Sequence, residues 1–256
     1  MVYLFSKMFA LWLLIGLYIG SCSCRFLLPR KIRARLLIRI TSFYCRIALR
    51  ILGIHLQVRR SNGIPTHSRT LYVCNHYSYL DILLIASVFP AHFISSREVE
   101  EMFFLGLMCK CGGSLFVERR NRQRISADIA AVSETIADGR PVLLFPEGTS
   151  SDGSSLLPFK VSLFAAVEQS DVQIVPLYLR YNRIDGQPFA TQNHAKVCYY
   201  GDMTFFPHLK QLIAVRSVSA TLSVLEPIPA VSYSRKEIAG MARAQMMQCF
   251  FDPIKT

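Results

Sequence analysis

The chain opens with a long apolar segment. No charged residue occurs from Met8 to Cys24, and the stretch up to Gly20 is almost wholly apolar. Seventeen uncharged residues lie at the short edge of what spans a bilayer. The pattern predicts an apolar helical anchor at the start of an N-terminal segment covering residues 1–60.

The second half of this segment has helical periodicity from Arg25 to Leu56. Leucine and isoleucine residues occupy the positions between four arginines that fall on one face, namely Arg35, Arg39, Arg46 and Arg50. This arrangement is typical of a basic amphipathic helix that lies in the lipid headgroup layer. The alternative is an ordinary domain helix whose charged face meets water.

After a turn-rich break at Asn62–Pro65, short apolar runs alternate with helical patterns. The apolar runs predict strands at Thr70–Cys74, Ala91–Ser95, Ser114–Val117, Val142–Phe145, Val172–Tyr178, Lys196–Tyr200 and Val218–Val224. The helical patterns are Leu80–Val88, Arg124–Asp138 and Leu163–Gln169. Residues 61–256 are therefore expected to form an α/β domain with a mixed β-sheet flanked by helices.

The charge distribution separates the two parts of the chain. The 256 residues carry a net charge of +12, yet residues 1–80 hold 12 lysines and arginines with no acid, and the remainder holds 17 of each sign. Anionic lipid fits a basic region with apolar neighbours, whereas sparse aromatic residues argue against nucleic acid. We therefore expect a membrane lipid partner and no nucleic acid partner.

Two features bear on cellular location. Ile19–Cys22 resembles a bacterial lipoprotein cleavage site, but the dense arginines from Arg25 onward favour the cytoplasmic face of a membrane. The eight cysteines are interpreted as reduced thiols. The two C-x-C pairs have no histidine at zinc-site spacing, so no metal site is predicted.

His76 and Asp81 form the first constellation that carries chemistry. On a regular helix, residues five apart lie about 140° apart around the axis, so the two side chains meet only if His76 precedes the helix. A strand ending at Cys74 and a helix capped by Ser78 would supply that geometry. A carboxylate-oriented histidine would serve as a general base. The alternative is a capping box of Ser78 and Asp81, with His76 as a turn residue.

A second constellation follows the expected strand Val142–Phe145. The chain there enters the loop Pro146–Gly153, which is rich in backbone donors and hydroxyls and carries Glu147 at its tip. Such a loop suits a polar headgroup, although it also fits a simple strand-to-helix connector.

These residues resemble the glycerolipid acyltransferases of the 1-acylglycerol-3-phosphate acyltransferase type. Four sequence blocks of that family occur in order between about residues 70 and 180. They are Asn75, His76, Ser78 and Asp81; Gly113, Phe116, Val117 and Arg119; Phe145, Pro146, Glu147, Gly148 and Thr149; and Val175 and Pro176.

The resemblance implies that His76 and Asp81 are catalytic. His76 would deprotonate the hydroxyl of a lysolipid, and this oxygen would attack the thioester of acyl-CoA or acyl carrier protein, with no further cofactor. Arg119 would bind an acceptor phosphate, while Glu147 and Gly148 would shape the acceptor site. The other residues expected to bind substrate are Asn75, Ser78, Gly113, Phe116, Thr149 and Lys160.

One position departs from the family pattern. Ser150 stands where many members carry arginine after the Phe-Pro-Glu-Gly-Thr run. The main expectation is acylation of 1-acyl-sn-glycerol-3-phosphate to phosphatidic acid. The Ser-Ser-Asp-Gly run also resembles members that acylate lyso-ornithine lipid or another lysophospholipid, so the headgroup stays open. A serine hydrolase is disfavoured because no G-x-S-x-G motif occurs, and the non-enzymatic alternative is a basic protein that binds membrane surfaces.

Overall fold

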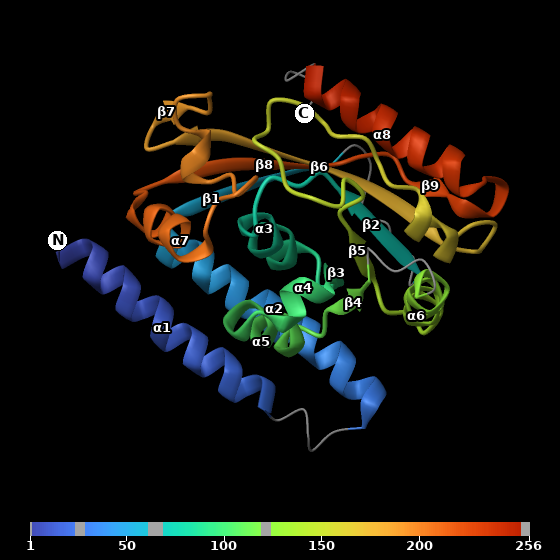
Figure 1. The fold of residues 1–256 in the computed structure, drawn as a ribbon, viewed down its shortest axis with the longest axis horizontal. Helices are drawn as coiled ribbons and strands as arrows, with labels where there is room; N and C mark the ends of the chain where they lie inside the picture. The colour runs from blue at the N-terminus through green and yellow to red at the C-terminus, as the bar shows by residue number, and fades with distance from the viewer. Residues whose placement is uncertain (1, 24–28, 61–68, 119–123, 252–256) are drawn as a thin grey trace.

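A computed structural model describes residues 2–23, 29–60, 69–118 and 124–251. The chain starts with two long helices, α1 (Val2–Ser23) and α2 (Arg30–Leu52), which pack side by side. Figure 1 shows this pair along one side of the molecule, away from the C-terminal helix α8 (Arg235–Phe251).

The core of the fold is a single mixed sheet, in which the strand order is β1-β8-β6-β2-β5-β3-β4 and β7 and β9 pair with β6. The strands are β1 (Ile54–Arg60), β2 (Thr70–Cys74), β3 (His92–Ser96), β4 (Leu115–Val117), β5 (Val142–Leu144), β6 (Gln173–Ile184), β7 (Gln187–Pro188), β8 (Val218–Val224) and β9 (Ile228–Pro229). Strands β2, β3, β4, β5 and β6 run parallel, and β8 is antiparallel to β6 but parallel to β1. The expected mixed α/β architecture is confirmed.

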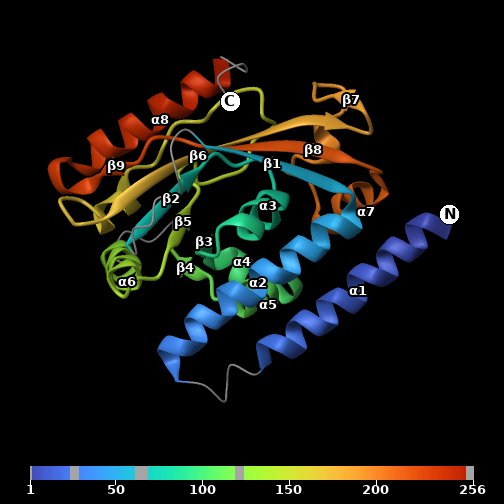
Figure 2. The same ribbon diagram turned by 180° about the vertical axis from the view of Figure 1, so that it is seen from behind.

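Helices cover both faces of this sheet (Figure 2). One hydrophobic cluster joins the sheet to α2, α3 (Leu80–Val88) and α7 (Phe205–Ala214), and the other joins it to α6 (Ile125–Ala137) and α8. The remaining helices, α4 (Arg97–Glu101) and α5 (Phe103–Cys111), follow β3. Strand β2 is buried at all five positions, as expected for a central strand with both faces covered.

The predicted helix through Leu56 is wrong at its C-terminal end. Helix α2 ends at Leu52 because Gly53 adopts a left-handed conformation with φ 73°, and a Cβ there would lie 2.3 Å from the Arg216 carbonyl oxygen. The next residues form β1, whose alternation of buried and exposed positions was hidden by a continuous apolar and basic pattern. Residues 54–60 therefore belong to the central sheet.

Beyond residue 60, the predicted elements lie within two residues of the observed ones, with three exceptions. Lys196–Tyr200 is not a strand but a short 3-10 turn, His194–Lys196, followed by irregular chain, and Leu163–Gln169 is a 3-10 helix at Ser162–Ala166. The strand expected to end at Tyr178 continues to Ile184. Helices α4 (Arg97–Glu101), α5 (Phe103–Cys111), α7 and α8 also lie where no helix was expected.

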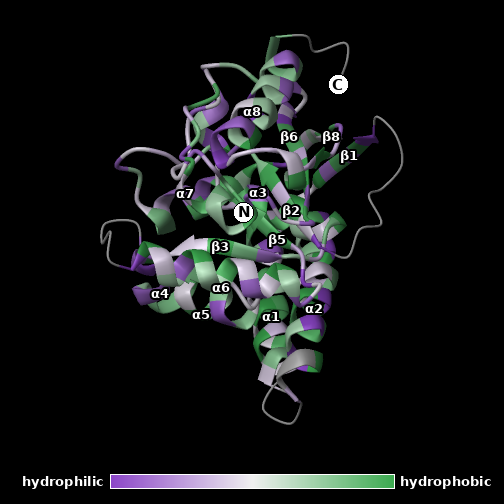
Figure 3. Ribbon diagram, turned by 90° about the vertical axis from the view of Figure 1, so that its right-hand side faces the viewer, coloured by the Kyte–Doolittle hydropathy of each residue, from purple (hydrophilic) through white to green (hydrophobic). Residues whose placement is uncertain are grey.

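Helix α1 has one face against the domain and one face open. Leu14, Tyr18 and Cys22 are buried, whereas Phe5, Phe9, Trp12, Leu13 and Leu17 are exposed. Figure 3 shows the mostly hydrophobic colouring of this helix beside the mixed colouring of α2. By length and composition, Tyr3–Ser23 is one helix that meets the requirements for crossing a membrane.

Polar contacts fix both ends of α1 to the rest of the chain. The buried Lys7 ammonium donates to the carbonyl oxygens of Leu52 at 3.0 Å and Val215 at 2.8 Å. At the other end, the hydroxyls of Ser21 and Tyr44 lie 2.7 Å apart. In this structure α1 therefore lies along the domain rather than projecting from it.

Candidate active site

The candidate site lies at the carboxyl end of β2, where the chain leaves the sheet. Asn75 directly follows the strand and is fully buried. Its amide nitrogen donates to the Leu179 carbonyl oxygen at 2.9 Å, and its amide oxygen accepts from the Leu179 amide at 2.8 Å. The Asn75 side chain thus continues the pairing of β2 with β6 for one more step and fixes the direction of the following turn.

His76 and Asp81 are brought together by this turn, as the spacing requires. His76 precedes α3, and its Nδ1 lies 2.9 Å from Asp81 Oδ2. The Asp81 carboxylate is fully buried, while the His76 side chain is 19% exposed. The same Oδ2 accepts from the backbone amides of Tyr77 at 2.6 Å and Ser78 at 2.8 Å. With Nδ1 committed to the carboxylate, Nε2 is the nitrogen left for chemistry.

The prediction that Ser78 is the N-cap of the helix is wrong by one residue. Helix α3 begins at Leu80 with Tyr79 at the N-cap position, which makes no side-chain capping bond. Ser78 Oγ nevertheless accepts from the Leu80 amide at 3.2 Å, and the Ser78 side chain is buried. Ser78 therefore supports the turn from inside the protein.

Tyr181 is a residue of this site that the sequence reasoning missed. It lies on β6, is buried, and its hydroxyl donates to Asp81 Oδ1 at 2.6 Å. Burial and then the neighbouring Asp81 raise the pKa of Tyr181 well above its usual value, so the phenol keeps the proton it donates. A tyrosine in the middle of an apolar strand is only weak evidence for a site residue. Its buried hydroxyl needs a hydrogen-bond partner, but the sequence does not identify that partner.

Glu147 contacts His76 through the backbone. Its Oε1 accepts from the His76 amide at 2.9 Å, and its Oε2 accepts from the Leu157 amide at 3.1 Å. Burial raises the pKa of Glu147 to about 7, although these two amide donors act in the opposite direction. The Glu147 side chain is only 2% exposed, so its carboxylate supports the turn that holds His76 from inside the protein.

The loop after β5 holds His76 in two further ways. The His76 ring is stacked on Phe145, with the ring centroids 4.0 Å apart and the planes inclined by 16°. The Ser151 amide donates to the His76 carbonyl oxygen at 3.0 Å. Ser150, at the position where arginine is common in the resembled family, donates its hydroxyl to the Tyr199 carbonyl oxygen.

The more exposed residues of this loop surround Gly148. With φ 71°, Gly148 adopts a conformation that favours glycine, and a Cβ there would lie 2.7 Å from Lys160 Nζ. Lys160 and Thr149 are both exposed. A cation and a hydroxyl are therefore available at the surface next to the buried Glu147.

Residues of the second sequence block are not all near His76. Gly113 precedes β4, at the amino end of the parallel strands, and its carbonyl oxygen accepts from His92 Nδ1 at 2.7 Å. Its observed neighbours are His92 and Leu37, which makes it a packing position. Phe116 is half-buried on β4, opposite Ser95. Arg119 lies outside the described residues, so its predicted phosphate contact stays a prediction.

The arrangement of His76 and Asp81 is suited to base-assisted acyl or proton transfer. It offers a histidine held by a buried carboxylate, a fixed turn, and polar groups at the rim. Within the described ranges, no group of three or more His, Cys, Asp or Glu side chains is arranged to hold a metal ion.

Comparison with known proteins supports this chemistry. The Acyltransferase family matches residues 55–180. The lyso-ornithine lipid O-acyltransferase of Rhodobacter capsulatus is 34% identical over 80% of this chain and 73% of its own length, and that of Pseudomonas aeruginosa is 31% identical over 78% and 74%. The 1-acyl-sn-glycerol-3-phosphate acyltransferase of Neisseria gonorrhoeae is 36% identical over 59% and 58%.

A solved structure shares the fold. The crystal structure of the 1-acyl-sn-glycerophosphate acyltransferase from Thermotoga maritima superimposes with a TM-score of 0.69, covering 96% of this chain and 94% of that one at 19% identity. The matched family and the sequence relatives show that this chain belongs to the acyltransferase family and is a lysolipid O-acyltransferase.

Proposed function

We propose that this enzyme transfers a fatty acyl chain from a thioester donor to the free hydroxyl of a lysolipid, with His76 as the general base. His76 Nε2 removes the hydroxyl proton, and the oxygen attacks the thioester carbonyl carbon. The carbon–sulfur bond then breaks, and the departing thiolate takes the proton from His76. The 2.9 Å contact between His76 Nδ1 and the buried Asp81 is the observation that supports this assignment. Asp81 orients the ring and stabilises its charged form.

The surrounding residues receive supporting roles in this proposal. Asn75, Ser78 and Glu147 have buried side chains that bind backbone groups, so they position the turn rather than contact the acceptor. Lys160 and Thr149 are the exposed candidates for contact with a carboxylate or phosphate of the acceptor headgroup. The proposed donor is acyl-CoA or an acyl carrier protein.

Lyso-ornithine lipid is the favoured acceptor, in preference to the initially expected 1-acyl-sn-glycerol-3-phosphate. Relatives named for lyso-ornithine lipid align over 74% to 82% of this chain, whereas the Neisseria relatives named for the glycerophosphate align over 59%. Ser150 also leaves the position without the cation that would suit a phosphomonoester. An ornithine headgroup carries one carboxylate and one amine, so it requires fewer positive charges in the binding site than a phosphomonoester does.

An acceptor panel tests the substrate assignment. Purified enzyme would be incubated with acyl-CoA or acyl carrier protein donors and with lyso-ornithine lipid or 1-acyl-sn-glycerol-3-phosphate. We expect a higher kcat/KM with lyso-ornithine lipid. The acceptor assignment fails if the glycerophosphate is the better substrate.

The His76→Ala variant tests the base. Loss of a general base should lower kcat by about 10²- to 10⁴-fold, without changing vesicle binding. An exposed histidine at a distance, His55→Ala on β1, serves as the matched control. Wild-type turnover by His76→Ala would exclude the mechanism.

We also propose that the enzyme is attached to the cytoplasmic face of a membrane through α1. The open face of α1 is apolar, and exposed arginines of α2, including Arg35 and Arg39, are suited to anionic headgroups. Because the other face of α1 contacts the domain along its length, an orientation in the membrane plane fits these contacts better than a crossing one.

A further inference from the structure

Large apolar side chains are exposed on two elements well beyond the N-terminal helices. Met102 and Phe103 lie at the start of α5 and are 41% and 93% exposed, and Leu107 follows one turn later at 37%. On α7, Phe206 is 63% exposed. We name these four residues the α5–α7 apolar surface. A fully buried phenylalanine stabilises a protein by about 1.5–3 kcal/mol, and Phe103 provides almost none of this in the isolated chain.

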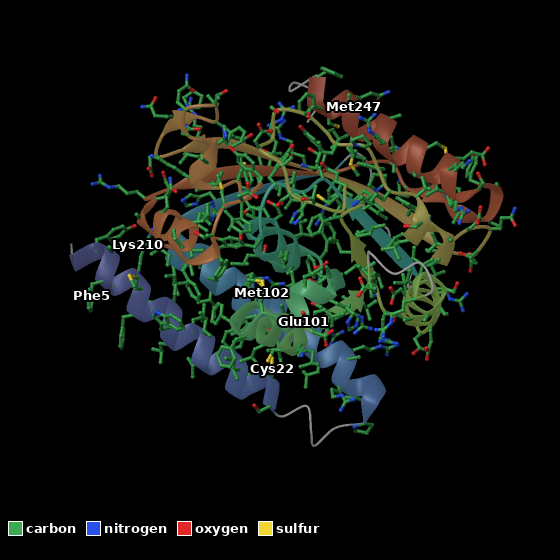
Figure 4. All side chains as sticks on the ribbon, in the orientation of Figure 1. Phe5, Cys22, Glu101, Met102, Lys210 and Met247 are labelled. Atoms are coloured by element: carbon green, nitrogen blue, oxygen red, sulfur yellow. The ribbon has the colours of Figure 1, made fainter. Side chains whose placement is uncertain are left out.

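Aromatic contacts connect this surface to α1. The Trp12 ring packs edge-on against Phe104, with the centroids 5.8 Å apart, and Phe104 contacts Phe205 at 6.1 Å. Phe103 and Phe206 are the exposed chain neighbours of these two packed rings. Figure 4 shows Phe5 and Met102 on the side of the molecule that carries α1, whereas Met247 of α8 lies across the sheet. The α5–α7 apolar surface therefore continues the open face of α1.

The charges near this surface are compatible with a lipid headgroup layer. Glu100 is neutralised by Arg97 at 3.3 Å and Lys110 at 3.5 Å. Glu101, which adjoins Met102, is exposed and would have to stay in contact with water. This limits how deeply the surface inserts, so the apolar side chains would reach the boundary between headgroups and acyl chains.

We infer that the α5–α7 apolar surface inserts into the same membrane leaflet as the open face of α1. The inference rests on the proposed attachment through α1 and extends it to residues outside 1–60. It also places the catalytic turn near the lipid. Phe205 contacts Tyr79 at 5.2 Å, and Tyr79 lies three residues after His76. A lysolipid leaving the bilayer beside α7 would meet this turn without crossing bulk water.

Single-tryptophan variants of the full chain test the inference. Trp12 is the only tryptophan, so Trp12→Phe provides a background without indole emission. Phe103→Trp and Phe206→Trp would each be added to it, with Phe251→Trp on α8, 73% exposed, as the matched control. The probe is a vesicle of phosphatidylcholine and phosphatidylglycerol, with and without brominated acyl chains.

The indole emission of the Phe103→Trp and Phe206→Trp variants should shift to the blue and fall about twofold with brominated lipid, as for a side chain inserted ~5–10 Å. Phe251→Trp should show neither effect. If both test variants behave like Phe251→Trp while the protein sediments with the vesicles, the inference is overturned and attachment through α1 stands. If no variant sediments with the vesicles, insertion of the α5–α7 apolar surface and attachment through α1 are both overturned. Acyl transfer to detergent-dispersed lysolipid tests the enzymatic assignment separately.

Discussion

At the Asp81 carboxylate, four donors converge on two oxygens. His76 Nδ1 and the amides of Tyr77 and Ser78 contact Oδ2, and the Tyr181 hydroxyl contacts Oδ1. A buried carboxylate with fewer donors would be free to rotate or would lose the hydrogen bonds that replace water. The direction in which His76 presents Nε2 therefore depends on side chains that need never touch a substrate.

Tyr181→Phe should lower kcat by about 10- to 100-fold, because a hydrogen bond to a charged group contributes ~1.5–3 kcal/mol. KM should change little, since Tyr181 is buried below the site. Steady-state kinetics measures both effects.

The matched control for this substitution is Tyr72→Phe. Tyr72 is also a buried strand tyrosine, and its ring contacts Phe89. An equal kinetic loss in both variants would assign Tyr181 a general packing role.

Glu147→Gln should change how stability depends on pH. The pKa of Glu147 is about 7 in the folded protein and about 4.3 in an unfolded chain. Protonation of Glu147 therefore favours folding, and this contribution is complete below pH ~4.3 and is lost as the pH rises through 7. Denaturant unfolding of the wild type and of Glu147→Gln would be measured between pH 5 and pH 8. Over this range the free energy of unfolding should fall further in the wild type than in the variant, by at most about 3 kcal/mol.

Asp81 and Arg243 also influence the pKa of Glu147. The effect of Glu147 is therefore taken from the difference in unfolding free energy between the wild type and the variant. Glu134→Gln, at an exposed position of α6, is the control and should follow the wild type. Parallel curves for wild type and Glu147→Gln would show that the Glu147 pKa is not raised in solution.

The sequence is informative about this site only over short separations. His76 and Asp81 are five residues apart, so helical geometry alone limits how they can meet. Tyr181 is 100 residues from Asp81, and the Glu147 contact joins residues 71 apart. Such contacts depend on which strands are neighbours, and the pattern of apolar residues does not specify strand order.

Among the elements, α1 shows most clearly how tertiary contacts go beyond a local pattern. Its apolar composition predicts a helix, but its orientation depends on Lys7, the single charged residue within it. Lys7 reaches the last carbonyl of α2 and the residue after α7, where two helix dipoles place negative partial charge. The predicted boundary at residue 60 likewise misses β1, because an edge strand with two arginines resembles the preceding helix in composition.

Lys7→Ala should loosen α1 from the domain. Two carbonyl oxygens would lose a charged donor, which costs on the order of 1.5–3 kcal/mol. We expect faster hydrogen exchange at backbone amides in residues 3–23 and a lower unfolding midpoint in detergent. Lys210→Ala, an exposed lysine of α7, is the control. Unchanged exchange in Lys7→Ala would mean that apolar contacts alone hold the helix.

At the scale of the whole molecule, the sheet divides two different environments. Helices α6 and α8 cover one face, and the other face carries α2, α3 and α7, with α1 outermost (Figure 1). Most of the basic residues within 1–80 belong to α2 and β1. The composition alone indicated a basic front attached to a neutral domain, whereas the pairing of β1 with β8 makes residues 54–60 part of the sheet of that domain.

The junction at Gly53 has a mechanical consequence. Helix α2 passes through this one residue into β1, which pairs with β8 along seven positions. Under the proposed attachment through α1, this short connection would hold the sheet at a fixed position relative to the membrane, and the fold would set the height of His76 above the lipid. The enzyme would then search for its substrate in the plane of the membrane, so turnover should depend on the surface density of lysolipid rather than on its bulk concentration.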